Sequence, residues 1–325
     1  MKNTKSKIVH ICLASHDEVM FRDHNDYVRA FNYFAEGVFA TESRAIAEGF
    51  MSDHFHICVQ TDSPQELLFK MRNAYVRYFN SRYHRNGRLA ERNAFVSEID
   101  GACHLTACVS YVLRQGLHHG LTTTVFEYPY TSANALFKRE LGKTADAPQM
   151  PEKSRYQYLL RSTCIDPSIR MDNTGQLFRE DVIDTHFTES IFITPKNFNY
   201  HMHRPSDASW ISEQTEKEEG NPVTLDAIER GVCHDTEALQ NNERGRVDSR
   251  HMTDMQLCEL IDKKYLPRYS QKEFSSIYTI KLFEREAIAN KISADLKRDA
   301  LRKSGRQFFV TDKQLVRCLA LKKED

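Results

Sequence analysis

The segment Ala45–Gln60 constrains the fold most, because it sets two histidines on alternate positions at the end of an apolar run. Its pattern predicts a strand or hairpin that ends in His54-Phe55-His56. In a strand, residues i and i+2 point to the same side of the sheet. Both imidazoles can therefore face one divalent metal ion while Phe55 and Ile57 enter a core. Two hydrogen-bonded, partly buried histidines without a metal are the alternative interpretation.

A helix is expected from His104 to His119, and Gly120 suits the position after its end. Tyr111 and Gln115 lie four residues apart and are therefore neighbours on the helix surface. The amide oxygen is a candidate third metal ligand. The phenol is a candidate nucleophile toward a phosphorus atom that the metal polarises. A tyrosine at a helix edge with no catalytic role is the alternative.

Strands and helices alternate along the first part of the chain. The sequence predicts a strand over Ile8–Leu13, a helix over Asn25–Gly37, and a helix that begins after Ser63 and runs to about Ser81. With the segment Ala45–Gln60, this order favours an α+β fold in which helices pack on an antiparallel sheet.

A cationic segment with interleaved aromatic rings follows the histidine pair. Between residues 67 and 92 the only acid is Glu91, whereas basic residues recur throughout. The candidate DNA-binding residues are Lys70, Arg72, Arg77, Arg82, Arg85 and Arg88. Cations for phosphates beside rings for bases are typical of single-strand binding. A solvated cationic helix face above core aromatics is the alternative.

Length and charge predict three regions. At 325 residues the chain is long enough for about two domains, and its net charge is zero. The charge is about +1 over 1–141, −7 over 142–249 and +6 over 250–325. We expect a catalytic domain, an acidic and partly irregular connecting region, and a basic helical C-terminal region that is a candidate for DNA binding.

The C-terminal region is expected to be helical. A long charged helix is predicted from Lys281 to Lys303, and a capping box at Thr311 and Gln314 opens a short helix over Leu315–Leu321.

The sequence has no apolar stretch of the roughly 20 residues that a membrane span needs. Scattered cysteines without a C-x-x-C pair fit reduced thiols, so we expect a cytoplasmic, nucleoid-associated protein with no membrane partner.

Five ordered blocks of this sequence resemble the HUH single-tyrosine transposases, in particular the REP-associated branch. MFRDHNDYVRAFNYFAEG (20–37) resembles the first helix of that family. AIAEGFMSDHFHICVQ (45–60) is similar to the family's metal strand, close to MPNHVHLLV. The segments 75–89, 111–121 and 128–136 resemble YARYFNRRYHRSGHL, YIHLNPVRAGL and YPWSSYRAY. Asp53 stands where the family commonly has Asn.

The resemblance implies a ferredoxin-like fold and a role for each site residue. It implies that His54, His56 and Gln115 hold Mg²⁺ or Mn²⁺, and that Tyr111 is the nucleophile. It further implies that single-stranded DNA next to a hairpin is cleaved and rejoined through a 5′-phosphotyrosine. A homodimer is one assembly that the sequence leaves open.

Two other functions remain compatible with these residues. An HUH replication or mobilisation nickase would share the histidine pair, although the block order favours a transposase. A non-cleaving, sequence-specific DNA-binding protein derived from a transposase belongs to a different class. The presence of all four residues of the candidate site, Tyr111, His54, His56 and Gln115, argues against that second alternative.

Overall fold

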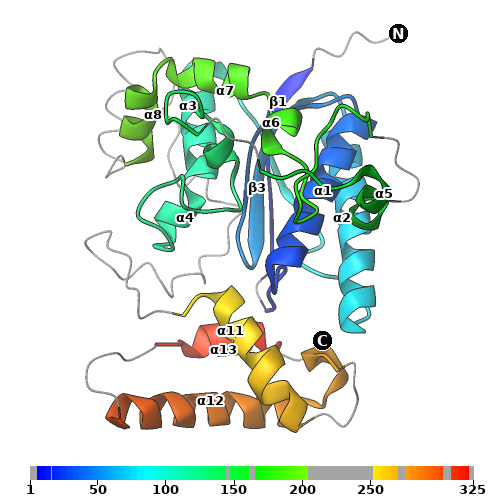
Figure 1. The fold of residues 1–325 in the computed structure, drawn as a ribbon, viewed down its shortest axis with the longest axis vertical. Coiled ribbons are helices and arrows are strands. Elements are labelled where there is room, and N and C mark those ends of the chain that lie inside the picture. The colour runs from blue at the N-terminus through cyan, green and yellow to red at the C-terminus, as the bar shows by residue number, and fades with distance from the viewer. Residues whose placement is uncertain are drawn as a thin grey trace.

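The computed structural model describes residues 6–15, 17–143, 147–160, 165–203, 252–269, 275–302 and 309–321. A four-stranded antiparallel sheet lies at its centre, with helices on both faces (Figure 1). The strands, in the spatial order β2-β3-β1-β4, are β1 (Lys7–Ala14), β2 (Arg44–Phe50), β3 (His54–Thr61) and β4 (Phe95–Glu98). The predicted α+β class is therefore confirmed.

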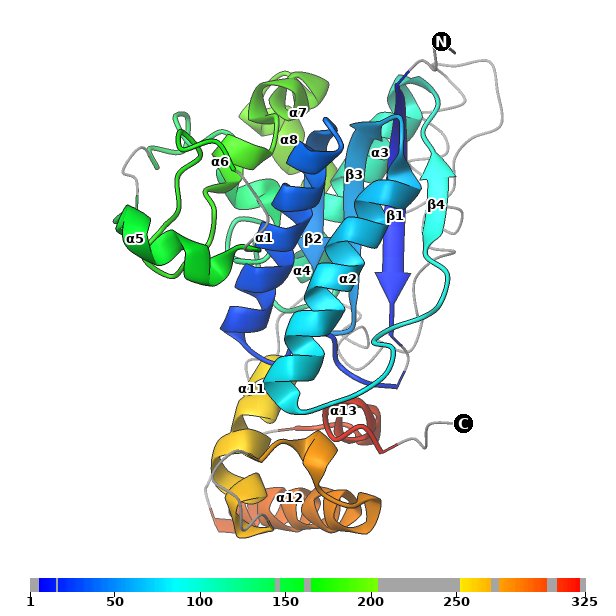
Figure 2. The same cartoon turned by 90° about the vertical axis from the view of Figure 1, so that its right-hand side faces the viewer.

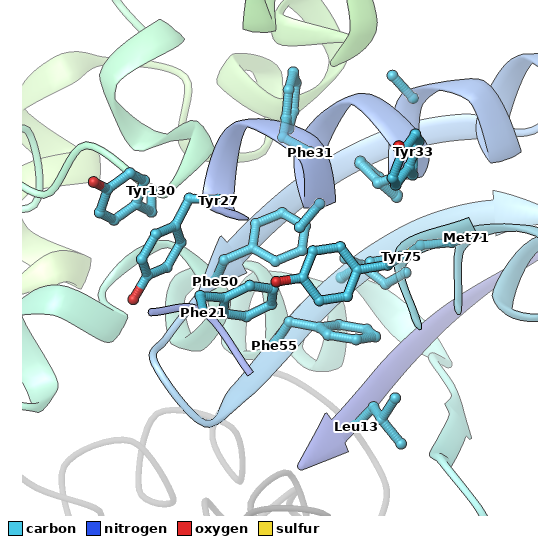
Figure 3. Packing of buried hydrophobic residues seen from close by; sticks show 14 of the residues in the cluster. Leu13, Phe21, Tyr27, Phe31, Tyr33, Phe50, Phe55, Met71, Tyr75 and Tyr130 are labelled. Carbon is cyan, nitrogen blue, oxygen red and sulfur yellow. The ribbon is translucent and has the colours of Figure 1, made fainter. Parts of the chain in front are cut away.

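Two helices cover one face of the sheet. Helix α1 (His24–Ala40) connects β1 to β2, and α2 (Pro64–Tyr83) connects β3 to β4, as Figure 2 shows. This β-α-β-β-α-β order is that of ferredoxin-like folds. Phe55 from β3 packs beneath these helices with rings such as Phe31 and Tyr75, and together they form the largest apolar cluster (Figure 3).

The opposite face is covered by α3 (Gly101–Leu113) and α7 (Thr185–Phe192), which packs on β2, and α8 (Pro195–Met202) packs against both helices. A second apolar cluster joins Cys58 of β3 to Val109 and Val112 of α3. Of the short elements, α4 (Gln115–His118) and η1 (Ser132–Ala135) lie near this face, and α6 (Arg179–Val182) lies at the β2 edge of the sheet. In contrast, α5 (Glu152–Arg155) and η2 (Tyr156–Tyr158) lie beside α1 (Figure 2).

Residues 252–269, 275–302 and 309–321 form a C-terminal module at one end of the sheet (Figure 1). Its elements are α11 (Asp254–Leu260), η4 (Ile261–Tyr265), η5 (Leu266–Arg268), η6 (Ile277–Thr279), α12 (Leu282–Arg302) and α13 (Asp312–Cys318). The module has its own apolar cluster, into which Val19 from the β1–α1 connection inserts. None of the described helices is long and apolar enough to cross a membrane.

Most predicted elements are found close to their expected bounds. The expected strand Ile8–Leu13 lies within β1, and the expected helix Asn25–Gly37 lies within α1. The capping box at Thr311 is present, but it opens α13 at Asp312, three residues before the predicted start. Of the connecting region expected over 142–249, residues 144–146, 161–164 and 204–249 lie outside the described residues.

Two predictions about the site elements are wrong. The segment Ala45–Gln60 is a hairpin of β2 and β3, which is one of its two predicted forms, but His54-Phe55-His56 begins β3 after a short turn and does not end the segment. The helix expected over His104–His119 is broken, because α3 ends at Leu113 and α4 begins at Gln115. The break is at Arg114, whose backbone (φ −93°, ψ 12°) leaves the helical region between the two helices. Within α4, Gly116 lies so close to Tyr128 that a Cβ would be 2.4 Å from its ring.

Candidate active site

Strand β3 turns both candidate metal ligands toward the face that α3 covers. His54 and His56 have no solvent exposure, and their ring centroids lie 5.2 Å apart. The neighbouring strand β1 pairs Cys12 with His56 and turns His10 to the same face. The alternation predicted for His54 and His56 therefore holds, and His10 of β1 faces the same side.

His54 is held in one tautomer by the residue before it. Its Nδ1 lies 2.7 Å from Asp53 Oδ1. Because an ionised carboxylate can only accept, this nitrogen carries the hydrogen, and Nε2 of a neutral ring presents its lone pair. Nε2 lies 3.4 Å from Gln115 Oε1, which is longer than a good N–H···O hydrogen bond.

The orientation of Gln115 follows from its own hydrogen bond. Its Nε2 donates to the Tyr111 carbonyl at 3.0 Å, and this turns Oε1 toward His54. Two acceptor atoms thus converge with no hydrogen between them, which fits a bound cation. In the described part of the chain, no cluster of three or more His, Cys, Asp or Glu side chains could hold a metal ion. A metal here would therefore depend on the amide as its third protein ligand.

His56 is paired with a histidine that sequence analysis did not assign to the site. His10 Nε2 lies 3.0 Å from His56 Nδ1, so one hydrogen is shared between them. Burial and nearby His104 lower the pKa of His10 to about 4. Burial and the surrounding histidines hold the pKa of His56 well below its usual value. Both rings are neutral at pH 7, as metal ligation requires.

Tyr111 lies directly beside the histidine pair. Its ring is perpendicular to that of His56, with centroids 5.1 Å apart, and only 1% of the residue is exposed. The ring of His118 lies 5.8 Å away, and burial together with Arg114 and His54 lowers the pKa of His118 to about 4. The structure thus brings together all four residues assigned to the candidate site, although α3 and α4 are separate helices.

A cavity of about 220 Å³ opens next to this cluster, between the sheet and the C-terminal module. Asp53 and His119 form its inner wall, and the His119 ring lies 5.3 Å from that of His54. Tyr128, Tyr130 and Met255 are among its other lining residues. The cavity therefore reaches the immediate neighbours of the candidate ligands, while the ligands themselves are fully buried.

Part of the cationic segment is paired within the protein. Arg82 contacts Asp23 and lies 2.7 Å from Asp26, and Arg85 pairs with Glu18. Arg72 donates to main-chain carbonyls at the end of the loop that follows α2. These contacts give the three arginines structural roles, while their assignment to DNA stays a prediction.

The other cations of this segment are exposed. Arg77 and Arg88 are exposed, as is Lys70, which lies 3.5 Å from Glu66. Lys70 and Arg77 lie on α2, which covers the sheet face opposite to α3. These residues of the segment and Tyr111 therefore lie on different faces of the sheet.

Comparisons with known proteins give matches among solved structures alone. No model of a known family matches this chain, and no curated protein matches its sequence. A solved structure described as the REP-associated tyrosine transposase bound to a REP hairpin is similar, with a TM-score of 0.37 and 11% sequence identity. The match covers 42% of this chain and 82% of the other. Any conclusion about function has to come from the residues of the site.

Proposed function

We propose that this protein is a metal-dependent DNA strand transferase of the transposase class, which cleaves and rejoins single strands. The observation that carries the proposal is the convergence of His54 Nε2 and Gln115 Oε1 at 3.4 Å, next to Tyr111. Two acceptor atoms facing each other in a buried site require a cation or another donor between them. A phenol beside such a cation is equipped to attack a phosphodiester.

Each residue has a defined task in this chemistry. His54, His56 and Gln115 would hold Mg²⁺ or Mn²⁺, which supplies the charge that polarises a scissile phosphate. The Tyr111 oxygen forms a bond to phosphorus and loses its proton. The bond from phosphorus to the 3′ oxygen breaks, and that oxygen leaves as a 3′-hydroxyl. A 3′-hydroxyl of a second strand reverses the step, so that no nucleotide cofactor is consumed.

The buried position of the site determines how DNA has to reach it. Tyr111 and the three candidate ligands are almost fully covered, so the scissile phosphate gains access only if surrounding side chains separate. The cavity beside Asp53 and His119 is the proposed entry, because the buried rings of Tyr128 and Tyr130 line it and can stack on an unpaired base once neighbours such as Tyr27 separate from them. A single strand fits this entry better than a duplex, whose bases are already stacked.

The test is covalent capture of DNA. Labelled single strands that carry the hairpins flanking the gene are incubated with protein and Mn²⁺ or Mg²⁺, and adducts are separated on a denaturing gel. We expect an adduct that needs the metal and disappears in Tyr111→Phe, while DNA binding by that variant persists. Tyr128→Phe and Tyr130→Phe are matched controls that should keep the adduct. An adduct that survives in Tyr111→Phe would overturn the assignment of the nucleophile.

The same experiment separates the alternative functions. A non-cleaving DNA-binding protein is favoured by one observation, the complete burial of His54, His56 and Gln115. It would bind the strands and give no adduct with any metal. A nickase would give the adduct but would not pass the strand to an added DNA with a free 3′-hydroxyl. Transfer to that acceptor is the result expected here.

A further inference from the structure

The C-terminal module contacts Asp53, the carboxylate that bonds His54 of the candidate active site. Two of the contacts that dock the module on the sheet end are partly buried side-chain pairs. Arg22 pairs with Asp262 at 2.8 Å, and Ser52 donates to Asp254 at 2.6 Å. The second contact lies next to Asp53, the residue that holds His54.

Arg317 of α13 lies between two buried carboxylates. Its Nε and Nη2 donate to Asp254 at 2.6 and 3.0 Å, and its Nε is 3.9 Å from Asp53 Oδ2. The other oxygen of Asp53 accepts the hydrogen bond from His54 Nδ1. A continuous chain of polar contacts thus runs from the C-terminal helix to a candidate metal ligand.

We propose that Arg317 is a positioning residue for His54. By holding the charged Asp53 in place, it keeps the His54 imidazole in the Nδ1–H tautomer with Nε2 directed at Gln115. A partner that fixes the distal nitrogen of a ligating histidine orients the ring and selects its tautomer. The C-terminal module is then a structural part of the metal site as well as a candidate DNA-binding region.

Two physical arguments support this role. A buried carboxylate is costly unless a cation or hydrogen bonds compensate it, and Arg317 is the cation that Asp53 and Asp254 share. The group of two carboxylates and one guanidinium carries one net negative charge. This negative charge lies beside His54, so it makes binding of a cation at the candidate metal site more favourable.

The tautomer of His54 can be read without metal or activity. Nitrogen-15 chemical shifts of labelled histidine in metal-free protein distinguish Nδ1–H from Nε2–H. We expect Nδ1–H in the wild type and in Asp53→Asn, because the amide oxygen still accepts. Asp53→Ala and Arg317→Met should show a mixture of tautomers. Arg317→Lys, which keeps the charge but loses the two-pronged contact, is the variant to use if Arg317→Met does not fold.

Arg22→Met is the matched control, because Arg22 is another buried arginine that bonds the module without contacting Asp53. It should leave the His54 tautomer unchanged. Mn²⁺ affinity, followed by electron paramagnetic resonance, should fall about 10- to 100-fold in Arg317→Met and little in Arg22→Met. In the Asp53→Asn background, Arg317→Met should have a much smaller effect, since no buried charge remains at residue 53.

The outcomes distinguish this inference from the function on which its metal-binding part rests. An unchanged tautomer in Arg317→Met and Arg317→Lys would overturn the positioning role. Equal loss of the tautomer in Arg22→Met and Arg317→Met would also overturn it, because docking alone would then explain the effect. Wild-type protein that shows the Nδ1–H tautomer but binds no Mn²⁺ would refute the proposed metal site and leave the role of Arg317 standing.

Discussion

The two faces of strand β3 have opposite chemistry. Phe55 and Ile57 point into the apolar cluster under α1 and α2, whereas His54 and His56 point toward α3 and are equally buried. Burial stabilises the first pair directly. The second pair loses hydration on burial and needs a partner at each polar atom. One strand thus contributes to stability through one face and to chemistry through the other.

The polar face is supported by specific partners instead of apolar area. His54 has Asp53 and Gln115 as neighbours, and His56 has His10. Asp53 and His10 each fix the nitrogen that the candidate metal would not use, whereas Gln115 faces the other nitrogen of His54. Neighbouring polar groups in the site therefore offset the cost of burying these histidines, so substitutions on this face should affect metal binding more than folding.

The largest expected effect comes from removing one candidate ligand. His54→Ala or His56→Ala should reduce metal-dependent adduct formation below detection, because two protein ligands cannot hold the ion in place. The fold should persist, since Phe55 and Ile57 still fill the core. Adduct yield against Mn²⁺ concentration and circular dichroism are the measurements. Wild-type adduct yields at limiting Mn²⁺ in both variants would refute the metal site.

The matching change on the apolar face is Phe55→Ala. It should lower the free energy of unfolding by about 3–5 kcal/mol, because it leaves a cavity among packed rings. Urea unfolding in the presence of a chelator measures this loss. The ligand variants should lose clearly less stability in the same assay. Equal losses on both faces would contradict the division of roles along β3.

The polar face should also make metal-free protein sensitive to acid. The folded-state pKa of His118 is about 4, below the ordinary value of 6.5, so the unfolded chain binds the proton more readily. Its contribution to stability is therefore present above pH 6.5 and is lost as the pH falls through 4. The contribution is on the order of 2 kcal/mol, allowing for partial exposure. Unfolding of His118→Gln should depend less steeply on pH between 6.5 and 4. An identical pH slope would contradict the lowered pKa.

Sequence reasoning recovered the local features of this fold and missed the contacts between distant segments. Alternation in β3 and the spacing of Tyr111 and Gln115 are properties of neighbouring residues, so they were predicted from the sequence. His10 joins the site only through the pairing of β1 with β3, which no local pattern reveals. Arg317 lies more than 260 residues from Asp53 along the chain, and its contact depends on how the C-terminal module docks.

The cationic segment shows the same limit. Its arginines were predicted as one DNA-binding group because charge is visible in the sequence, whereas the acids that neutralise some of them are not local. Arg82 finds Asp23 and Asp26 on the α1 side, and Arg85 finds Glu18. The sequence therefore could not separate structural arginines from exposed ones.

The smallest expected effect tests whether the α1/α2 face takes part in binding DNA. If the segment contacts single-stranded DNA, Arg77→Ala with Arg88→Ala removes two exposed cations and should reduce the slope of log K against log salt by about 1.4, at roughly 0.7 per contact. Arg82→Ala with Arg85→Ala is the matched pair. It should change that slope little and instead lower the melting temperature, because it leaves buried Asp26 without its cation.

Fluorescence anisotropy with single-stranded, hairpin and duplex probes over a salt series measures both pairs. Wild-type protein should bind the single strand better than the plain duplex, since aromatic rings stack only on unpaired bases. An unchanged slope in the Arg77 and Arg88 double variant would remove these exposed cations from the DNA path. Among the described residues, the α3 side and the C-terminal module, which meet at the cavity beside Asp53 and His119, would then be the next regions to test. In that case Arg77 and Arg88 would take no part in DNA binding, as expected if the α1/α2 face serves stability and the α3 face serves chemistry.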